Sequence, residues 1–308
     1  TISATSTIAS GGKTFPGPVT FSGSNTKTLS GSWTISGTLS ATTTTTTINH
    51  TAAENLSCAG LSISGTTTGN CLVTITGGTW SGVSTNTLTS LTISGNVTVS
   101  GAVTFSTGTL TYSSGTVTTT GSTVTVGAST TFDTNGISWN NITLSANSIT
   151  LTLNSLFTVT GTLSCGANTG QIFAGTAGFT VGTFSHAISS ATTVTLQNSV
   201  TYTITTAFNA FNSRIGSILL FTSNDGTVTA TLILGSGATC NVLASFTRIN
   251  ATGGRPIITF NGVLTTTTNI VVQTNVAVNP PKYSRKFGRR KSIYNRPLQV
   301  QYVSVGNE

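Results

Sequence analysis

The sequence predicts an all-β protein whose chain winds as a parallel β-helix, a β-solenoid, and three observations support this. First, 70 of the 308 residues are Thr, 39 are Ser and 34 are Gly, whereas only 5% are charged. Second, residues that favour helices are scarce, while Thr, Val and Ile are stiff at χ1 and pack well in pleated sheets. Third, short apolar-alternating segments recur along the chain. Intrinsic disorder is excluded because 36% of the residues are apolar and few are charged.

The recurring segments have the pattern of strands with one buried face. The segment Trp33–Ser40 (WTISGTLS) returns almost unchanged as Phe157–Ser164 (FTVTGTLS), and Leu61–Gly65 and Leu91–Gly95 share its signature. Within each segment a large apolar residue alternates with Thr or Ser, the period of two that is typical of a strand. We expect the Gly of each segment to supply the positive φ of a sharp corner.

The spacing of the segments favours stacked repeats. Segments begin at Trp33, Leu61 and Leu91, which are 28 and 30 residues apart. Coils of about 20–30 residues predict roughly 9–14 coils. Tandem β-sandwich domains are the alternative, since they also have short strands separated by turns. The short segments and the degenerate repeats favour the solenoid, and we expect inward Thr, Ser and Asn to form ladders between coils.

The chain divides near residue 276. Seven of the twelve basic residues fall within residues 282–296, and the last Thr is Thr274. Asn279-Pro280-Pro281 lies at this change, and two successive prolines fix an extended connector. The sequence therefore predicts a Thr/Ser/Gly-rich shaft over residues 1–275 and a basic anchoring or assembly arm over residues 276–308.

Catalytic residues are not expected. Glycoside hydrolysis needs two carboxylates roughly 5–9.5 Å apart, and residues 1–275 contain only Glu54, Asp133 and Asp225. Glu54 and Asp133, the closest pair, are 79 residues apart, which predicts a separation on the order of 15 Å along the solenoid. We therefore predict that the chain is not an enzyme, although a site shared between subunits stays open. Asp133 and Asp225 each precede a Gly in a turn-like sequence and are expected in turns.

Metal and cofactor sites are not expected either. The two histidines, His50 and His186, are isolated, and we predict that each is a surface or ladder residue. No C-x-x-C pair is present, so the cysteines do not predict a zinc site. A Cys58–Cys71 disulfide stays open, but we favour buried small apolar side chains. The four cysteines are Cys58, Cys71, Cys165 and Cys240.

Two further features concern surfaces. No run of 18 apolar residues is present, so the sequence predicts no membrane span. Trp33, Trp80 and Trp139 could stack on sugars, but we interpret them as large core or corner residues.

The arm carries the predicted docking site. Its basic residues alternate with aromatic ones, a pattern that suits insertion into an acidic protein surface. A solvated surface is the first alternative. Nucleic acid is the least favoured interpretation, because Leu298–Val305 then alternates like one more strand that could add to the sheet edge of a partner. The predicted docking residues are Lys282, Tyr283, Arg285, Lys286, Phe287, Arg289, Arg290, Lys291, Tyr294 and Arg296.

The chain resembles the β-helical shafts of bacteriophage fibres, spikes and capsid-attached appendages over residues 15–275. Trp139–Ser145, Thr150–Leu153 and Phe157–Gly161 carry this resemblance. The chain is also similar to bacterial adhesins with β-solenoid passengers. The resemblance implies a virion structural protein, usually a trimer in tail spikes, that projects from the particle and touches host glycans. It transfers no catalytic residues.

These observations lead to one expected function and two alternatives. We expect a non-enzymatic structural protein of a phage virion, located on the extracellular particle, with other virion proteins, further copies of itself and host glycans as partners. A secreted or cell-surface bacterial adhesin is the first alternative, and a glycan depolymerase with an intersubunit carboxylate site is the second. Tail fibres generally anchor through their N-terminal part, so a C-terminal arm is equally compatible with attachment at the head or neck.

Overall fold

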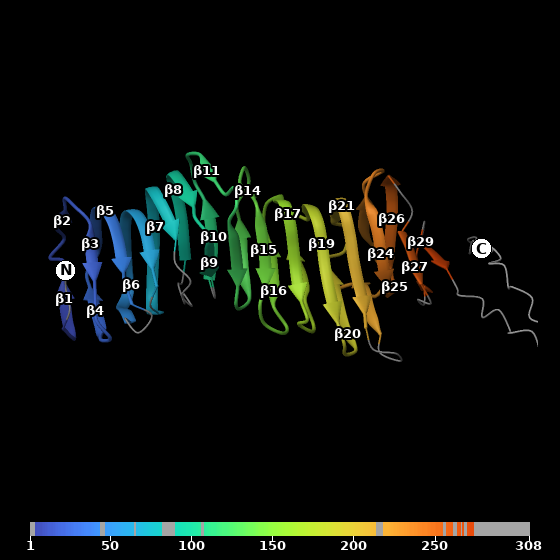
Figure 1. Cartoon of the computed structure of the whole chain (residues 1–308), viewed down its shortest axis with the longest axis horizontal. Coiled ribbons are helices and arrows are strands. Elements are labelled where there is room, and N and C mark those ends of the chain that lie inside the picture. The colour runs from blue at the N-terminus through green and yellow to red at the C-terminus, as the bar shows by residue number, and fades with distance from the viewer. Residues whose placement is uncertain are drawn as a thin grey trace, which may run out of the picture.

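The computed structural model is a rod-shaped parallel β-solenoid of about ten turns (Figure 1). It describes residues 4–43, 47–64, 66–81, 90–105, 108–213, 218–254, 257–260, 264–265, 267 and 270–273. Over these residues there is no helix, and every strand pairing is parallel. The fold confirms the predicted β-solenoid over the tandem β-sandwich alternative.

The described strands form two sheets of 17 and 12 strands. The larger sheet contains β1 (Ser6–Ala9), β2 (Thr14–Phe15), β3 (Val19–Phe21), β4 (Thr26–Ser30), β5 (Trp33–Ala41), β6 (Thr47–Ile63), β7 (Thr66–Ser81), β8 (Ser90–Val99), β10 (Gly108–Tyr112), β11 (Val117–Thr118), β13 (Thr130–Asp133), β16 (Thr150–Leu153), β18 (Ile172–Gly175), β20 (Thr192–Leu196), β22 (Leu219–Ser223), β25 (Ser245–Thr247) and β28 (Leu264–Thr265). The smaller sheet contains β9 (Ala102–Phe105), β12 (Thr123–Val126), β14 (Ser138–Trp139), β15 (Asn141–Leu144), β17 (Phe157–Gly166), β19 (Phe179–Ile188), β21 (Thr201–Asn212), β23 (Ala230–Leu234), β24 (Thr239–Leu243), β26 (Ile249–Gly254), β27 (Ile257–Phe260) and β29 (Ile270–Gln273).

Between Trp33 and Leu110, a coil is shorter than the spacing of the sequence segments suggested. Three strand segments make one coil: β13, β14 and β15 form one, and β16 with the two parts of β17 forms the next. The register runs from Trp33 to Leu56, Val73, Leu91 and Leu110, in steps of 17 to 23 residues. The 28- and 30-residue spacing is therefore not the coil period. The coil is short because strands such as β5 and β17 pass over a corner without a loop.

The interior of the coils is mainly apolar, and most Thr and Ser side chains of the strands face outward. Along β16 the side chains of Leu151 and Leu153 are buried, while Thr150 and Thr152 are only partly covered. Burying a side chain such as Leu stabilises a fold by about 1.5–3 kcal/mol. The expectation of inward Thr, Ser and Asn ladders was therefore wrong for most positions, because the inward half of each alternating strand supplies the hydrophobic core. The three tryptophans, as predicted, belong to this buried core: Trp33, Trp80 and Trp139.

The glycines of the recurring segments have a different role from the one expected. Gly37 and Gly161 are not among the described glycines with positive φ. A Cβ atom at Gly37 would lie 2.6 Å from the backbone nitrogen of Pro18, and one at Gly161 would lie 2.5 Å from the carbonyl oxygen of Asn140. These positions require Gly because the preceding coil approaches the backbone too closely for a side chain.

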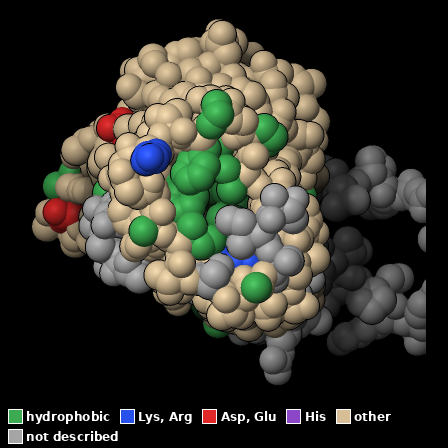
Figure 2. All heavy atoms as spheres, turned by 90° about the vertical axis from the view of Figure 1, so that its left-hand side faces the viewer, with side chains coloured by type: hydrophobic (Ala, Val, Ile, Leu, Met, Phe, Trp, Pro, Cys, Tyr) green, Lys and Arg blue, Asp and Glu red, His purple; other side chains and the backbone are tan. Residues whose placement is uncertain are grey.

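The N-terminal end of the solenoid leaves a strand edge open. Strands β1, β2 and β3 each pair with one later strand, β4 or β5, and with no other strand that the structure describes. Half-buried Ile8, Phe15 and Val19 pack against the core from this first coil. Figure 2 views this end and shows apolar side chains gathered at its centre. Pro16 and Pro18 lie in the first coil between β2 and β3.

Candidate functional site: the outward faces of the shaft

Outward side chains form straight polar columns along the shaft, because residues in register on successive coils point in the same direction. One column lies on the larger sheet and ends in a carboxylate. Its members are Thr14, Thr34, Ser57, Thr74, Thr92, Thr111 and Asp133. Adjacent members are about 4.8 Å apart, the spacing of neighbouring strands.

A second column lies on the smaller sheet and carries no charge. Its members are Thr104, Thr125, Thr143, Ser164, Ser185, Asn209 and Asn241. Near its end the amide of Asn241 donates from Nδ2 to Oδ1 of Asn209 at 3.2 Å. Hydroxyls at some corners also donate to the preceding coil, as Thr160 does to the carbonyl oxygen of Trp139 at 3.1 Å. These faces can therefore donate and accept hydrogen bonds, but they supply no acid–base pair.

The three acidic residues of the shaft lie on well-separated coils. Four register steps separate the coil of Glu54 from that of Asp133, and four more separate Asp133 from Asp225, or about 19 Å each. The first series runs through Leu56, Val73, Leu91, Leu110 and Phe132, and the second through Thr130, Leu151, Phe173, Leu196 and Ser223. Both separations exceed the roughly 5–9.5 Å that two glycosidase carboxylates need. A site completed by a second subunit stays untested.

Asp225 is a turn residue, as predicted. Its Oδ1 accepts hydrogen bonds from the backbone N–H of Thr227 at 2.6 Å, the hydroxyl of Thr227 at 2.8 Å and the N–H of Val228 at 3.2 Å. These bonds, the Thr227 N–H first, hold the pKa of Asp225 below its usual value. Asp133 differs from the expectation, because it is the exposed last residue of β13 and precedes the turn at Asn135-Gly136.

Of the two positions predicted for His186, surface or ladder, the surface position was wrong, because the side chain lies inside the coil and bonds to the preceding coil. His186 is two residues after Phe184 on β19, so both side chains point toward the core, and His186 is fully buried. Its Nδ1 donates to the carbonyl oxygen of Gly166 at 3.2 Å, while Nε2 has no hydrogen-bond partner. Burial lowers the pKa of His186, and the Gly166 carbonyl partly opposes this effect. The side chain of His50 lies outside the described residues.

The interpretation of the cysteines as buried small residues is confirmed for Cys58 and Cys165, while the side chain of Cys71 lies outside the described residues. Cys58 and Cys165 are buried, Cys240 is half-buried, and none of these three forms a disulfide. The register places Cys58 beside Ile75 and Cys71 beside Glu54, so the Cys58–Cys71 disulfide is not formed. Burial raises the pKa of Cys58 to about 12 and raises that of Cys165 as well. Within the described part of the chain, no group of three His, Cys, Asp or Glu could hold a metal ion.

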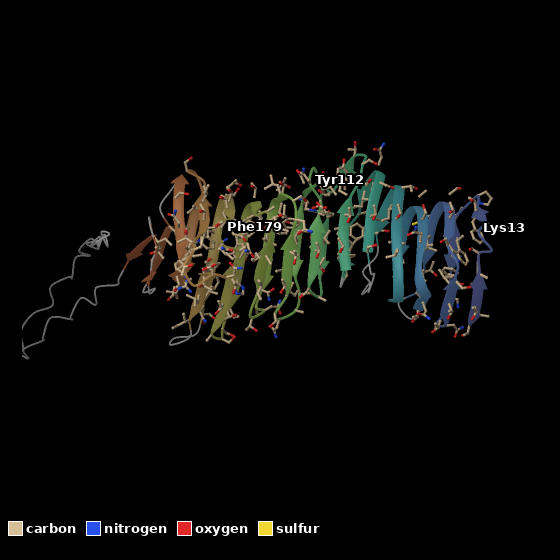
Figure 3. All side chains as sticks on the ribbon, turned by 180° about the vertical axis from the view of Figure 1, so that it is seen from behind. Lys13, Tyr112 and Phe179 are labelled. Carbon is tan, nitrogen blue, oxygen red and sulfur yellow. The ribbon has the colours of Figure 1, made fainter. Side chains whose placement is uncertain are left out.

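Most aromatic side chains are not available for stacking on a ligand. Figure 3 shows the side chains along the shaft, with Tyr112 and Phe179 labelled. Phe179 is buried, and Tyr112 is half-buried with its hydroxyl donating to the carbonyl oxygen of Gly115 at 2.6 Å. Phe211 is the most exposed aromatic side chain that the structure describes, at 40%. The repeat Ala-Phe-Asn-Ala-Phe-Asn over residues 207–212 signals this exposure, because it places apolar residues at both parities of one strand.

The predicted docking residues of the arm lie outside the described residues, as does the proposed boundary near residue 276. This applies to all ten: Lys282, Tyr283, Arg285, Lys286, Phe287, Arg289, Arg290, Lys291, Tyr294 and Arg296. The docking interpretation and the partner it implies stay predictions.

Over the described residues, the fold and surface define a class, the parallel β-solenoids with a sparsely charged, hydroxyl-rich exterior. A scan against protein-family models, a search of curated proteins and a search of solved structures each returned no match. Among the described residues there is no helix that is long and apolar enough to cross a membrane.

Proposed function

We propose that this chain is a non-enzymatic structural protein of a phage particle, a tail fibre, spike or capsid-attached appendage. Residues 1–275 would form its shaft and residues 276–308 its anchoring or assembly arm. The observation that supports this most is the mainly apolar interior of about ten coils, in which buried polar side chains such as Lys27, Gln171 and His186 are exceptions among the described residues. Such a stack resists bending because each coil buries its core against both neighbours.

The outward faces suit a shaft exposed to solvent. Their columns of Thr, Ser and Asn remain hydrated without presenting the large apolar patches that promote aggregation. The open edge at β1–β3 needs a cover, because unpaired strand edges invite association. Further copies of the chain, as in a homotrimer, or another virion protein would supply that cover.

The decisive experiment tests whether the protein is located on phage particles. An antibody against residues 108–213 would be applied to purified particles from the source culture and viewed by electron microscopy. We expect label on projecting appendages and the intact chain among the particle proteins by mass spectrometry. Label on bacterial surfaces, with particles devoid of the chain, would reject the virion role and support the adhesin.

The adhesin alternative rests on the same outward columns, which can hydrogen-bond to hydroxyl-rich glycans. Binding of the purified chain to host glycans, lost when Thr125→Val and Thr143→Val remove two hydroxyls of the uncharged column, would favour it. Thr152→Val on the other sheet is the matched control. Unchanged binding in the double variant would exclude this column as a glycan site.

A further inference from the structure

An apolar strip interrupts the polar exterior near the C-terminal end of the shaft. Phe211 on β21 and Leu243 on β24 are in register, point outward and are 40% and 38% exposed. Ala187 on β19 is in register with Phe211 and is also exposed. We call these three residues the apolar strip. The adjacent outward column is polar at the same coils, with Asn209 and Asn241 bonded to each other.

The described chain ends beside this strip. Val242, which precedes Leu243, is in register with Thr259 on β27, and Thr259 with Val272 on β29. Strand β29 ends one residue later, at Gln273. Gln273 is therefore abreast of the strip, at two strand spacings or about 10 Å from Leu243 and at three spacings or about 14 Å from Phe211.

The residues that follow have the length and pattern to cover the strip. Val276, Val278 and Pro280 alternate with polar or small residues, so an extended segment would present one apolar face. Three residues span about 10 Å and five span about 16 Å, which match the distances to Leu243 and Phe211. Pro280-Pro281 lacks two N–H donors and cannot continue the ladder of parallel strands.

We propose that residues 274–281 turn back along the shaft and cover the apolar strip, with Val276 over Leu243 and Val278 over Phe211. The contact replaces exposed apolar surface on both partners with a packed one. It also fixes where the arm begins. The basic residues 282–296 then leave the flank of the shaft about three coils before its end, and not its tip.

Cysteine pairs test the contact in the full-length chain with Cys71→Ser and Cys240→Ser. The two test pairs are Phe211→Cys with Val278→Cys and Leu243→Cys with Val276→Cys. The matched control is Thr247→Cys with Val278→Cys, which places the first thiol on an outward position of the other sheet in a neighbouring coil. Disulfides need Cα atoms within about 7 Å, so only a seated segment links efficiently.

We expect mild oxidation to link both test pairs within one chain and to leave the control largely reduced, as read by peptide mass spectrometry and non-reducing gels. Equal linkage in the control would show an unseated segment and overturn the proposal. Linkage only between chains would overturn it in favour of a second copy as the occupant, and no linkage in any pair would overturn it outright.

Hydrogen exchange provides a second readout without new thiols. In the unsubstituted chain, amides of residues 274–279 should exchange at least about tenfold more slowly than in the Phe211→Asp variant, because seating lowers local opening. Asn209→Asp, one outward position away, is the control and should leave the exchange unchanged. Equal exchange in the unsubstituted chain and in Phe211→Asp would overturn the proposal.

Discussion

The two halves of the shaft have the same coil but different interiors. In the N-terminal half, residues 6–126, the buried columns are mainly Leu, Ile and Val, and the ring contact recorded there stacks Phe15 on Trp33 at 4.7 Å. In the C-terminal half, residues 130–254, buried rings form two groups of contacts, one around Phe132 and one that runs from Phe173 to Phe246.

The coils also lengthen toward the C-terminus. Register steps are 17 to 23 residues between Trp33 and Leu110, whereas the step from Ala207 to Thr239 is 32. A solenoid tolerates this change because each coil contacts only its neighbours, so interior size can drift as long as adjacent coils match. The core residues can therefore change along the shaft while the fold stays the same. We expect core substitutions to lower the stability of the two halves by different amounts.

The largest effect is expected from opening the aromatic interior. Phe184 contacts the rings of Phe173, Phe179, Phe208 and Phe221 at centroid distances of 5.8 to 6.1 Å. Phe184→Ala should lower the free energy of unfolding by about 3–5 kcal/mol, the cost of an aromatic truncation in a packed core. Urea unfolding with hydrogen-exchange mass spectrometry would measure the loss and show whether it is confined to the C-terminal half.

Leu91→Ala is the matched truncation in the N-terminal half, since Leu91 is equally buried. It should cost about 2–5 kcal/mol and destabilise the coils around β8 first. If either variant lowers the stability of both halves equally, the shaft unfolds as one cooperative unit. The two halves would then not differ in their free energy of unfolding.

A smaller effect is expected where coils approach closely, and it should be similar in both halves. Gly37→Ala and Gly161→Ala each place a Cβ about 2.5 Å from backbone atoms of the preceding coil and should cost about 1–3 kcal/mol through displaced backbone. Gly226→Ala is the control, because its Cβ would meet nothing within 4 Å. Thermal unfolding midpoints would be compared, and a Gly161→Ala midpoint equal to that of Gly226→Ala would refute the close approach.

Acidification should weaken the C-terminal half by a still smaller amount. Burial holds the folded-state pKa of His186 below its ordinary value of 6.5, so the unfolded chain binds a proton more readily. The stabilisation is complete above pH 6.5 and is lost as pH falls from there toward the folded-state pKa. Urea unfolding at pH 7.5 and 5 would show the change. His186→Leu should remove the part due to this residue, and an unchanged pH dependence would contradict the assignment.

The smallest effect is expected when the natural cysteines are labelled, because no residue is changed. Their labelling rates report how often the coils of each half open. Cys58 and Cys165 are buried on β6 and β17, with raised pKa values, whereas Cys240 on β24 is half-buried. At pH 8 a thiol reagent should modify Cys240 first and reach Cys58 and Cys165 only when their coils open. Peptide mapping over time gives the rate at which the coils around Cys58 open in the N-terminal half and the rate around Cys165 in the C-terminal half. Immediate labelling of Cys165 would contradict its burial.

The parts of the fold that were predictable have local causes. Alternation of Phe, Val and Leu with Thr and Ser in Phe157–Ser164 indicates a strand with one buried face, and its recurrence as Trp33–Ser40 indicates a repeat. The buried tryptophans and the Asp225 turn followed from side-chain size and turn chemistry. The coil period could not be read from segment spacing, because similar segments do not occupy equivalent positions in their coils: Leu61 is in register with Leu39 and not with Trp33.

The exterior shows the same limit. The outward hydroxyl columns form only when one set of alternate residues in each strand faces the core. Which set faces the core depends on contacts between coils. The alternation in residues 207–212 does not tell which phenylalanine is buried; packing against Phe184 and Phe246 buries Phe208 and leaves Phe211 outside.

By itself, the sequence determined a β-rich stacked chain without a paired-carboxylate or metal motif in its shaft, because composition and period-two alternation act within a single strand. Only the tertiary structure decided the coil length, the interior place of His186, the separation of the acids and the apolar strip. The physical reason is that register joins residues 17 to 32 positions apart, and this pairing is fixed by packing between coils, which no local pattern encodes.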